Sequence, residues 1–457
     1  MSLRSAASLR GPLPANRVLS IDAFRGILML LLLPDIRGGF SFYEMHRQFP
    51  DDPLWARLAA AFTHVKWSGA SIWDLIMPSF LFLVGVAMPL SASARRRRGD
   101  SSRDLLRHVC LRAVALFVLA LLLTMPLPTH LHEIWPLGFL VIALPVPQRL
   151  AAHYGLTKAN QRRLETVWWV GILLVSFAWI LAHVSERGNY DLGHVFTALA
   201  LASPPAFLLV GRPRRVQFGV AFAVLAGYWL LFALYPLPAP GFDLESVGVR
   251  PGDEIGSGFF AHWNKNTNAA AAFDVWFLNL LPRSRSFLYQ GNGVQTLQFV
   301  PIISTMILGI VAGEILSSDR NPLEIRRTLS IWGTLGVAAG LVGSYFVCPL
   351  VKSIWTPTWT LFSTGIAALS LALLYEVCDV RGMRSWALPF QVLGTNSILL
   401  YTLASAYRWR ILEIPEKLLG NQLGVGAYAP VVESLIVGAF LWLVAFVLYR
   451  SRIFVRL

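Results

Sequence analysis

Apolar segments long enough to cross a lipid bilayer recur along the whole chain, and they constrain its fold more than any other feature. A transmembrane helix needs about 20 apolar residues. Backbone groups cannot be left unpaired in lipid, so these segments predict helices. We therefore expect an all-α, polytopic transmembrane bundle of eleven or twelve spans, of which the fourth is the weakest. The segments cover residues 18–36, 70–92, 108–127, 134–148, 166–184, 194–210, 216–236, 294–316, 328–349, 356–377, 386–406 and 428–449.

The composition supports a single integral membrane domain over residues 1–457. Hydrophobic residues make up 55% of the chain and charged residues only 14%, whereas soluble domains are about one quarter charged. The formal net charge of +14 could suggest a nucleic-acid partner. Lysine and arginine also accumulate in the cytoplasmic loops of membrane proteins, which explains the excess better. The expected partner is the bilayer, with no nucleic acid.

The distribution of basic residues predicts the orientation of the bundle. Most of the 39 lysines and arginines fall in alternate connecting segments, including residues 1–17 and the four consecutive arginines Arg95–Arg98. The positive-inside rule places these segments and both termini in the cytoplasm. The long loops 37–69 and 237–293 then lie on the outer side. We expect a bacterial inner (plasma) membrane, with the periplasm facing these loops.

Two charged residues lie inside the first predicted span. Asp22 and Arg25 are three positions apart, so they share one face of a helix near its cytoplasmic end. Ionisable groups within a membrane span are costly and often functional. A structural ion pair and a site for an anionic ligand explain this pair equally well.

Three polar residues are expected at the outer mouth of the first two spans. Asp35 ends the first span, His64 ends the following loop, and Asp74 opens the second span. A carboxylate beside a histidine can fix its tautomer and raise its basicity, which is a general-base arrangement. The plainer alternative is an interfacial histidine that is simply hydrogen-bonded. Lys66 and Trp67 follow His64 and are candidates for substrate contacts.

Other candidates lie in later segments. His262, followed by Trp263 and Asn264, suits sugar recognition, although loop asparagines more often stabilise turns. Lys352 beside Trp355 has the alternative of a lysine that reaches the interface next to an aromatic residue. Asn396 lies in a late span. A metal site is not expected, because the His130 and His132 pair lacks further ligands.

Four sequence blocks carry a resemblance to a known family. They are residues 20–26 (Ser-Ile-Asp-Ala-Phe-Arg-Gly), the block from His64 through Trp67, Gly69, Asp74, Pro78 and Phe80 to Gly85, residues 352–356 (Lys-Ser-Ile-Trp-Thr) and residues 389–396. Together they resemble the heparan-alpha-glucosaminide N-acetyltransferase family and its bacterial relatives of the DUF5009 type.

The resemblance implies acetyl transfer across a membrane, from acetyl-CoA as co-substrate to the amine of a terminal glucosamine. It also implies that His64 is the catalytic histidine. Family members commonly carry an asparagine at the outer end of the first helix. Asp35 stands there in this chain, so a carboxylate replaces an amide that could donate a hydrogen bond to an oxyanion.

These observations predict an acyltransferase that acetylates an amino sugar or a cell-envelope glycan. His64 would act as general base or as transient acetyl carrier. Arg25 lies roughly 15 Å inward from Asp35 along the first helix, so it or the basic inner loops could hold the phosphates of CoA. The acceptor is a small molecule or glycan, and we allow for a homodimer. The alternative is a transporter or flippase without acyl chemistry.

Overall fold

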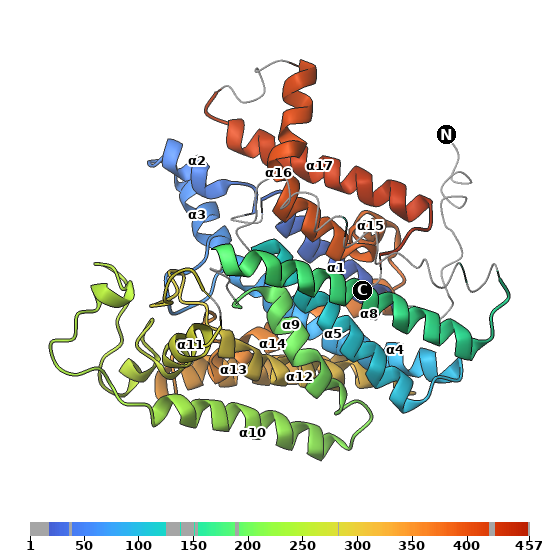
Figure 1. Ribbon diagram of the computed structural model, residues 1–457, viewed down its shortest axis with the longest axis horizontal. Coiled ribbons are helices and arrows are strands. Elements are labelled where there is room, and N and C mark those ends of the chain that lie inside the picture. Colours follow the sequence, from blue (N-terminus) through green and yellow to red (C-terminus); the bar gives the residue numbers. More distant parts are fainter. Residues whose placement is uncertain are drawn as a thin grey trace.

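The computed structural model describes residues 18–35, 39–124, 138, 150, 154–187, 192–281, 283–419 and 426–455. Helices dominate these residues, and their only β pairing is two isolated bridges, Asp35 with Gly39 and Ser68 with Val351 (Figure 1). The α-helices are α1 (Leu19–Leu32), α2 (Phe42–Gln48), α3 (Pro53–Phe62), α4 (Ile76–Arg97), α5 (Ser102–Thr124), α8 (Lys158–Arg187), α9 (Val195–Phe207), α10 (Arg214–Ala233), α11 (Ala269–Asn279), α12 (Phe299–Leu316), α13 (Pro322–Phe346), α14 (Pro357–Tyr375), α15 (Leu388–Thr395), α16 (Ser397–Leu419) and α17 (Ala429–Arg450).

Seven of the described helices are long and apolar enough to cross a membrane, and an eighth span is possible if the bent pair α15–α16 counts as one. This confirms the all-α polytopic fold. The described part of the chain has fewer such helices than the eleven or twelve spans predicted. One reason is that α1 and α9 are only 14 and 13 residues long. The predicted span 134–148 lies outside the described residues, apart from the single residue 138.

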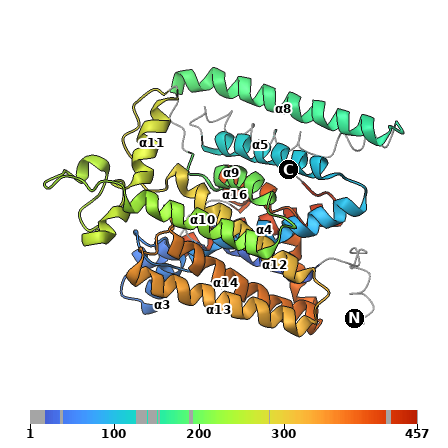
Figure 2. The same cartoon turned by 90° about the horizontal axis from the view of Figure 1, so that it is seen from below.

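Glycines allow close contact at two helix interfaces, α4–α12 and α1–α15. A Cβ atom on Gly85 of α4 would overlap the carbonyl oxygen of Met306 on α12. Gly309 faces the Phe82 carbonyl oxygen from the other side of the same interface, and Gly26 of α1 similarly abuts Phe390 of α15. Small residues are the usual means of close packing between membrane helices. The α4–α12 pair thus forms a tight unit, between the α8 edge and the α13–α14 edge of the molecule (Figure 2).

The break between α15 and α16 is fixed by a side chain. The two helices meet at an angle of 66° on either side of Asn396. The Asn396 Nδ2 group donates to the carbonyl oxygen of Ile453 over 3.1 Å, and its Oδ1 atom accepts from the Val455 N–H over 2.8 Å. Asn396 therefore holds the segment after α17 against the bend between α15 and α16.

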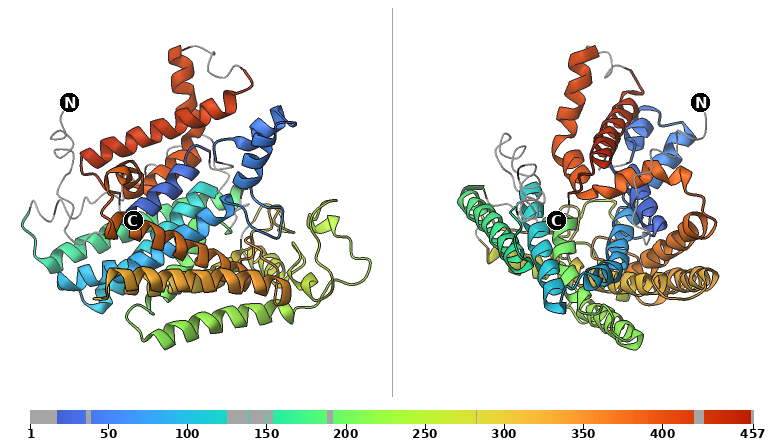
Figure 3. Two further views of the ribbon diagram at one scale, coloured as in Figure 1. Left: turned by 180° about the vertical axis from the view of Figure 1, so that it is seen from behind. Right: turned by 90° about the vertical axis from the view of Figure 1, so that its right-hand side faces the viewer.

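The two long predicted loops fold against each other. Residues 37–69 include α2 and α3, while residues 237–293 include a 3₁₀ turn (Gly258–Trp263) and α11. Both segments lie on the same side of the molecule (Figures 1 and 3). Trp67 Nε1 donates to the Trp263 carbonyl oxygen over 2.9 Å, and Ser68 Oγ donates to the Glu254 carboxylate over 2.6 Å. These contacts hold the chain just after His64.

Candidate active site

His64 and Asp74 form a short hydrogen bond. His64 lies just after α3, and Asp74 lies in the 3₁₀ turn Trp73–Leu75 that leads into α4, so the intervening chain makes a tight return. The His64 Nδ1 atom is 2.6 Å from Asp74 Oδ1. The histidine side chain is 56% exposed, whereas that of Asp74 is only 2% exposed. A buried carboxylate therefore supports a histidine that remains accessible.

The second oxygen of Asp74 is held by its own loop. Asp74 Oδ2 accepts from the Ser71 hydroxyl over 2.9 Å and from the backbone N–H groups of Val65 and Ser71 over 3.2 and 3.3 Å. Hydrogen bonds of this kind favour the ionised carboxylate. They also fix its orientation, because both oxygens are occupied by groups close in sequence.

Lys352 completes the cluster from the segment between α13 and α14. Its Nζ atom is 3.2 Å from Asp74 Oδ1 and 3.2 Å from His64 Nδ1, and its side chain is 17% exposed. Burial lowers the pKa of the Lys352 ammonium below its ordinary value, while the Asp74 carboxylate acts in the opposite direction. Lys352 was predicted as a substrate-binding residue, and it lies directly beside the histidine.

The hydrogen bonds determine which nitrogen of His64 can act as a base. An ionised carboxylate can only accept, so the 2.6 Å contact with Asp74 requires the ring proton on Nδ1, and Lys352 then donates to the Asp74 carboxylate and not to Nδ1. The lone pair of neutral His64 is then on Nε2. Among the described residues Nε2 has no hydrogen-bond partner, and the ring lies 6.3 Å from that of Trp73. This is the orienting role of a carboxylate behind a catalytic histidine.

His64 and Lys352 line one large cavity of about 1870 Å³. The same cavity is lined by Arg95 and Arg98 at the far end of α4, and by Arg162 of α8. Since α4 has 22 residues, it is about 33 Å long. The cavity thus runs between the two ends of the bundle, which we call the His64 end and the arginine end.

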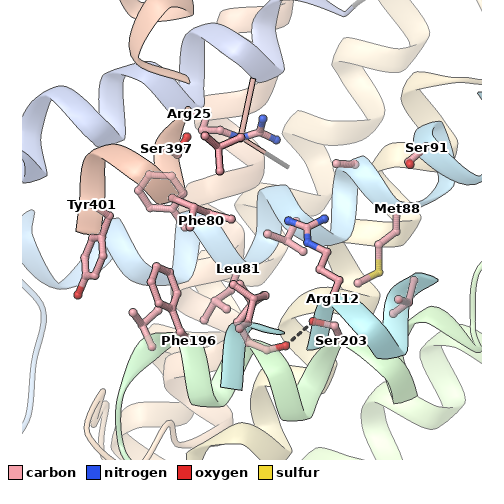
Figure 4. A pocket seen from close by; sticks show the side chains of 18 of the residues that line it. Arg25, Phe80, Leu81, Met88, Ser91, Arg112, Phe196, Ser203, Ser397 and Tyr401 are labelled. Carbon is pink, nitrogen blue, oxygen red and sulfur yellow. Dashed lines mark hydrogen bonds between the residues drawn. The ribbon is translucent and has the colours of Figure 1, made fainter. Parts of the chain in front are cut away.

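Two further arginines enter the cavity between its ends. Arg25 of α1 and Arg112 of α5 line it from opposite walls, among apolar side chains such as Phe80 and Leu81 (Figure 4). Arg112 has no carboxylate within ion-pair distance among the described residues. Arg25 was a predicted ligand contact, whereas Arg112 was not. The signal was available, since Arg112 also interrupts an apolar segment.

The structure does not bring Asp35 to His64. The Asp35 carboxylate accepts from the Ser41 hydroxyl over 2.9 Å and lies 4.0 Å from the Arg408 guanidinium. Ser41 also contacts the Ser434 hydroxyl over 2.7 Å. Arg408 lies on α16 and Ser434 on α17. Through these contacts Asp35 connects the end of α1 to α16 and α17. Being near the same level of the bundle did not imply sharing one site.

Several other predicted site residues have structural contacts instead of lining the cavity. Trp67 is buried against Trp263, and Lys66 reaches the Gly252 carbonyl oxygen over 3.4 Å. Trp355 is fully buried and donates to Thr305. Asn396 holds the segment after α17, as described above. None of the four is among the cavity-lining residues, whereas His64, Lys352 and Arg25 are.

The remaining predicted site residues, Asn264, His262 and Asp22, also lie outside the cavity lining. Asn264 bonds to both the N–H and the carbonyl group of Gly256, over 2.7 and 3.0 Å, which is the turn-stabilising alternative. His262 Nδ1 is 2.9 Å from the Tyr235 carbonyl oxygen. Asp22 is 6% exposed on α1 and does not line the cavity, unlike Arg25 one turn later. The described residues contain no group of three potential metal ligands.

Fold and site together define a class: a polytopic membrane protein in which a histidine–aspartate–lysine cluster opens into a long cavity with arginines at its other end. The human heparan-alpha-glucosaminide N-acetyltransferase is 27% identical to this chain over 462 residues, and its mouse counterpart is 24% identical over 474 residues. Each alignment covers 96% of this chain. The chain is therefore similar over nearly its whole length to heparan-alpha-glucosaminide N-acetyltransferases, in agreement with the resemblance of the four sequence blocks.

The chain spans about three fifths of the length of these relatives, 59% of the human protein and 60% of the mouse protein. No protein-family model matches the sequence.

Proposed function

We propose that this chain is a membrane acetyltransferase that moves an acetyl group from acetyl-CoA to the amine of an amino sugar. The observation that carries the proposal is the cluster of His64, Asp74 and Lys352 at one end of a cavity whose other end is basic. The names of the human and mouse relatives support the same reaction class.

The chemistry of aminolysis suits the His64 side chain. An amine attacks a thioester only when it is deprotonated, and the carbonyl oxygen then gains negative charge. His64 Nε2 is the free base that takes the amine proton while the C–S bond breaks, and it passes this proton to the departing CoA thiolate. Alternatively Nε2 is the nucleophile that accepts the acetyl group as the C–S bond breaks and CoA leaves, and the amine then takes the acetyl group from Nε2 and releases its proton to solvent. Asp74 holds the ring and stabilises its positive charge after proton uptake. Lys352, 3.2 Å from Nδ1 and paired with Asp74, adds a cation at the His64 end of the cavity, where the negative charge develops.

The cavity fits an elongated, polyanionic co-substrate. Acetyl-CoA carries phosphates at one end and a thioester at the other, and the cavity offers guanidinium groups and a histidine at its opposite ends. Arg95, Arg98 and Arg162 are the candidate phosphate ligands at the arginine end. Arg25 and Arg112 are the candidates farther inside. Guanidinium groups are well suited to phosphate oxygens because they donate two parallel hydrogen bonds.

The proposed orientation follows from where acetyl-CoA is made. The arginine end faces the cytoplasm, both termini are cytoplasmic, and the His64 end faces the outer side of a bacterial inner membrane. The acceptor is then an amino sugar or a glycan of the cell envelope that is reached from outside. The positive-inside distribution of lysine and arginine supports this orientation.

One observation favours a second function, transport or flipping of a sugar or lipid-linked substrate. The α15–α16 pair is a helix broken at 66° beside the cavity, and broken helices are common at the substrate sites of transporters. The two functions differ in chemistry, because transport consumes no acetyl-CoA.

The test is acetyl transfer by the purified, detergent-solubilised protein, with radiolabelled acetyl-CoA and a panel of amino sugars that includes glucosamine. His64→Ala should abolish transfer and leave thermal unfolding nearly unchanged, since His64 is largely exposed. His262→Ala is the matched control, because His262 lies outside the cavity and should retain transfer. Transfer at the wild-type rate in His64→Ala would refute the site, and movement of an amino sugar across vesicles without acetyl-CoA turnover would favour transport.

A further inference from the structure

A second histidine at the cavity wall has no part in the acetyl-transfer cluster. His194 is the N-cap residue of α9, and its Nδ1 atom accepts from the backbone N–H of Phe196 over 3.2 Å. Its Nε2 atom is 3.3 Å from the hydroxyl oxygen of Tyr401 on α16. His194, Phe196 and Tyr401 all line the cavity that His64 lines.

The hydrogen bonds fix the tautomer of this histidine. Nδ1 accepts a backbone N–H, so the proton of neutral His194 is on Nε2. Nε2–H therefore donates to the Tyr401 oxygen. The Tyr401 O–H does not need to point at His194, and its hydrogen is available as a donor. His194 acts on the cavity through Tyr401.

Aromatic rings hold the pair in place. The ring centroids of Phe196 and Tyr401 are 5.0 Å apart, and those of His194 and Phe196 are 5.3 Å apart, both in edge-to-face geometry. Figure 4 shows Tyr401 and Phe196 side by side on the cavity wall, away from Arg112 and Met88. A polar hydroxyl next to an aromatic face is the usual pairing for a sugar ring, which has hydroxyl groups at its edge and C–H groups on its faces.

A chain of hydrogen bonds places the pair at the His64 end of the cavity. Gln298 Nε2 donates to the carbonyl oxygen of Gly193, the residue before His194, over 2.7 Å. Gln298 N–H in turn bonds to Gln295, whose own N–H donates to Ser353 beside Lys352. Three hydrogen bonds thus link the residue before His194 to the residue after Lys352. The pair lies on the wall formed by α9 and α16 and not by α4.

The size of the cavity leaves room for two molecules. Sites for one small ligand usually measure about 300–1,000 Å³, and this cavity measures about 1870 Å³. A donor that extends from the arginine end to His64 would therefore leave space beside it at the His64 end.

We propose that Tyr401, positioned by His194, forms the acceptor subsite and donates a hydrogen bond to a ring hydroxyl of the amino sugar. This inference rests on the proposed acetyltransferase function. It adds the place of the acceptor and a residue that sets acceptor specificity.

The test is steady-state kinetics of the full chain with acetyl-CoA and glucosamine. Tyr401→Phe keeps the ring packing and removes the donor, so the KM for glucosamine should rise about 3- to 10-fold while the KM for acetyl-CoA stays unchanged. His194→Asn can still cap α9 through its side-chain oxygen but loses the Nε2 contact, so it should show the same split. The double variant should be no worse than Tyr401→Phe alone.

Substrate analogues sharpen the test. One mono-deoxy glucosamine should be as poor for the wild type as glucosamine is for Tyr401→Phe, and Tyr401→Phe should not distinguish the two sugars. Unchanged glucosamine KM in an active Tyr401→Phe, or a rise confined to the KM for acetyl-CoA, would overturn the subsite. If Tyr401→Phe does not fold, the wild-type analogue series and His194→Asn decide the question. Absence of any acetyl transfer by the wild type would instead refute the proposed function.

Discussion

The role of Asp74 can be tested with a substitution that keeps its shape. Asp74→Asn retains an oxygen for the Ser71 hydroxyl but presents an NH₂ group to either His64 or the loop backbone. If the amide donates to His64 Nδ1, the ring proton moves to Nε2, and the free base at the cavity is lost. A charge-assisted hydrogen bond contributes about 1.5–3 kcal/mol, so we expect kcat/KM to fall about 10- to 100-fold.

The same substitution should also destabilise the fold, for a separate reason. Lys352 would keep its charge at 17% exposure without the carboxylate 3.2 Å away. Removing one partner of a buried ion pair costs about 3–5 kcal/mol, and the residual exposure of Lys352 favours the lower limit. Thermal unfolding in detergent should therefore shift to lower temperature in Asp74→Asn.

A double variant separates the two effects. Lys352→Met removes the unpaired charge, so Asp74→Asn with Lys352→Met should recover most of the thermal stability of the wild type. Acetyl transfer should remain at or below the level of Asp74→Asn. Two results would refute the reasoning: wild-type kcat/KM in Asp74→Asn, or a double variant that is no more stable than Asp74→Asn.

Three further predictions follow from packing and charge. Gly85→Ala should lower the free energy of unfolding by about 1–3 kcal/mol, because its Cβ would meet the α12 backbone. Gly219→Ala on α10 has open space around it and should not lower this free energy. Thermal unfolding measures both variants. The lowered pKa of Lys352 should bring the alkaline loss of acetyl transfer below pH 10.5, and Lys352→Arg should move it upward in a pH–rate profile. Since the unfolded chain keeps this proton to higher pH than the folded chain, the Lys352 contribution to the free energy of unfolding should rise with pH just below 10.5. Arg112→Gln should raise the KM for acetyl-CoA about 10-fold or more, and exposed Arg163→Gln should leave it unchanged.

The sequence predicted the two site residues that are close in the chain, His64 and Asp74. His64 and Asp74 are ten positions apart, and a histidine that follows one helix and a carboxylate that opens the next can meet only if the chain returns tightly. Their hydrogen bond of 2.6 Å agrees with that expectation. Lys352 is 288 positions from His64, and an interfacial lysine beside a tryptophan has a common explanation without function. Only the tertiary packing shows that this lysine points at the histidine.

Other residues could not be placed because the sequence carries no information on partners from distant helices. Asp35 was expected beside His64 from its level along the first helix. It contacts Ser41 of the following loop and Arg408 of a late helix, and Ser41 in turn bonds to Ser434 of another late helix. The pairing of the Tyr401 hydroxyl with His194 likewise depends on how α9 and α16 meet, which apolar periodicity does not determine.

The all-α fold followed from segment length and hydrophobicity, since these properties are local. The number of spans did not follow as well, because hydrophobicity does not show where a helix ends. Asn396 is an example: the predicted span 386–406 is one apolar segment, but the helix breaks there and bends by 66°. An asparagine inside an apolar run was a sign of such a break, as its side chain can bond to backbone groups.

The contacts between the two long loops limit how relatives of this protein can be recombined. Trp67 and Ser68, three and four residues after His64, depend on Trp263 and Glu254 of the second loop for their positions. A chimera that imports only the first loop would carry His64 but lose the surface that holds the chain beside it. Loop exchange aimed at a new acceptor should therefore transfer residues 37–69 and 237–293 as one unit, even though more than 160 residues separate them in the chain.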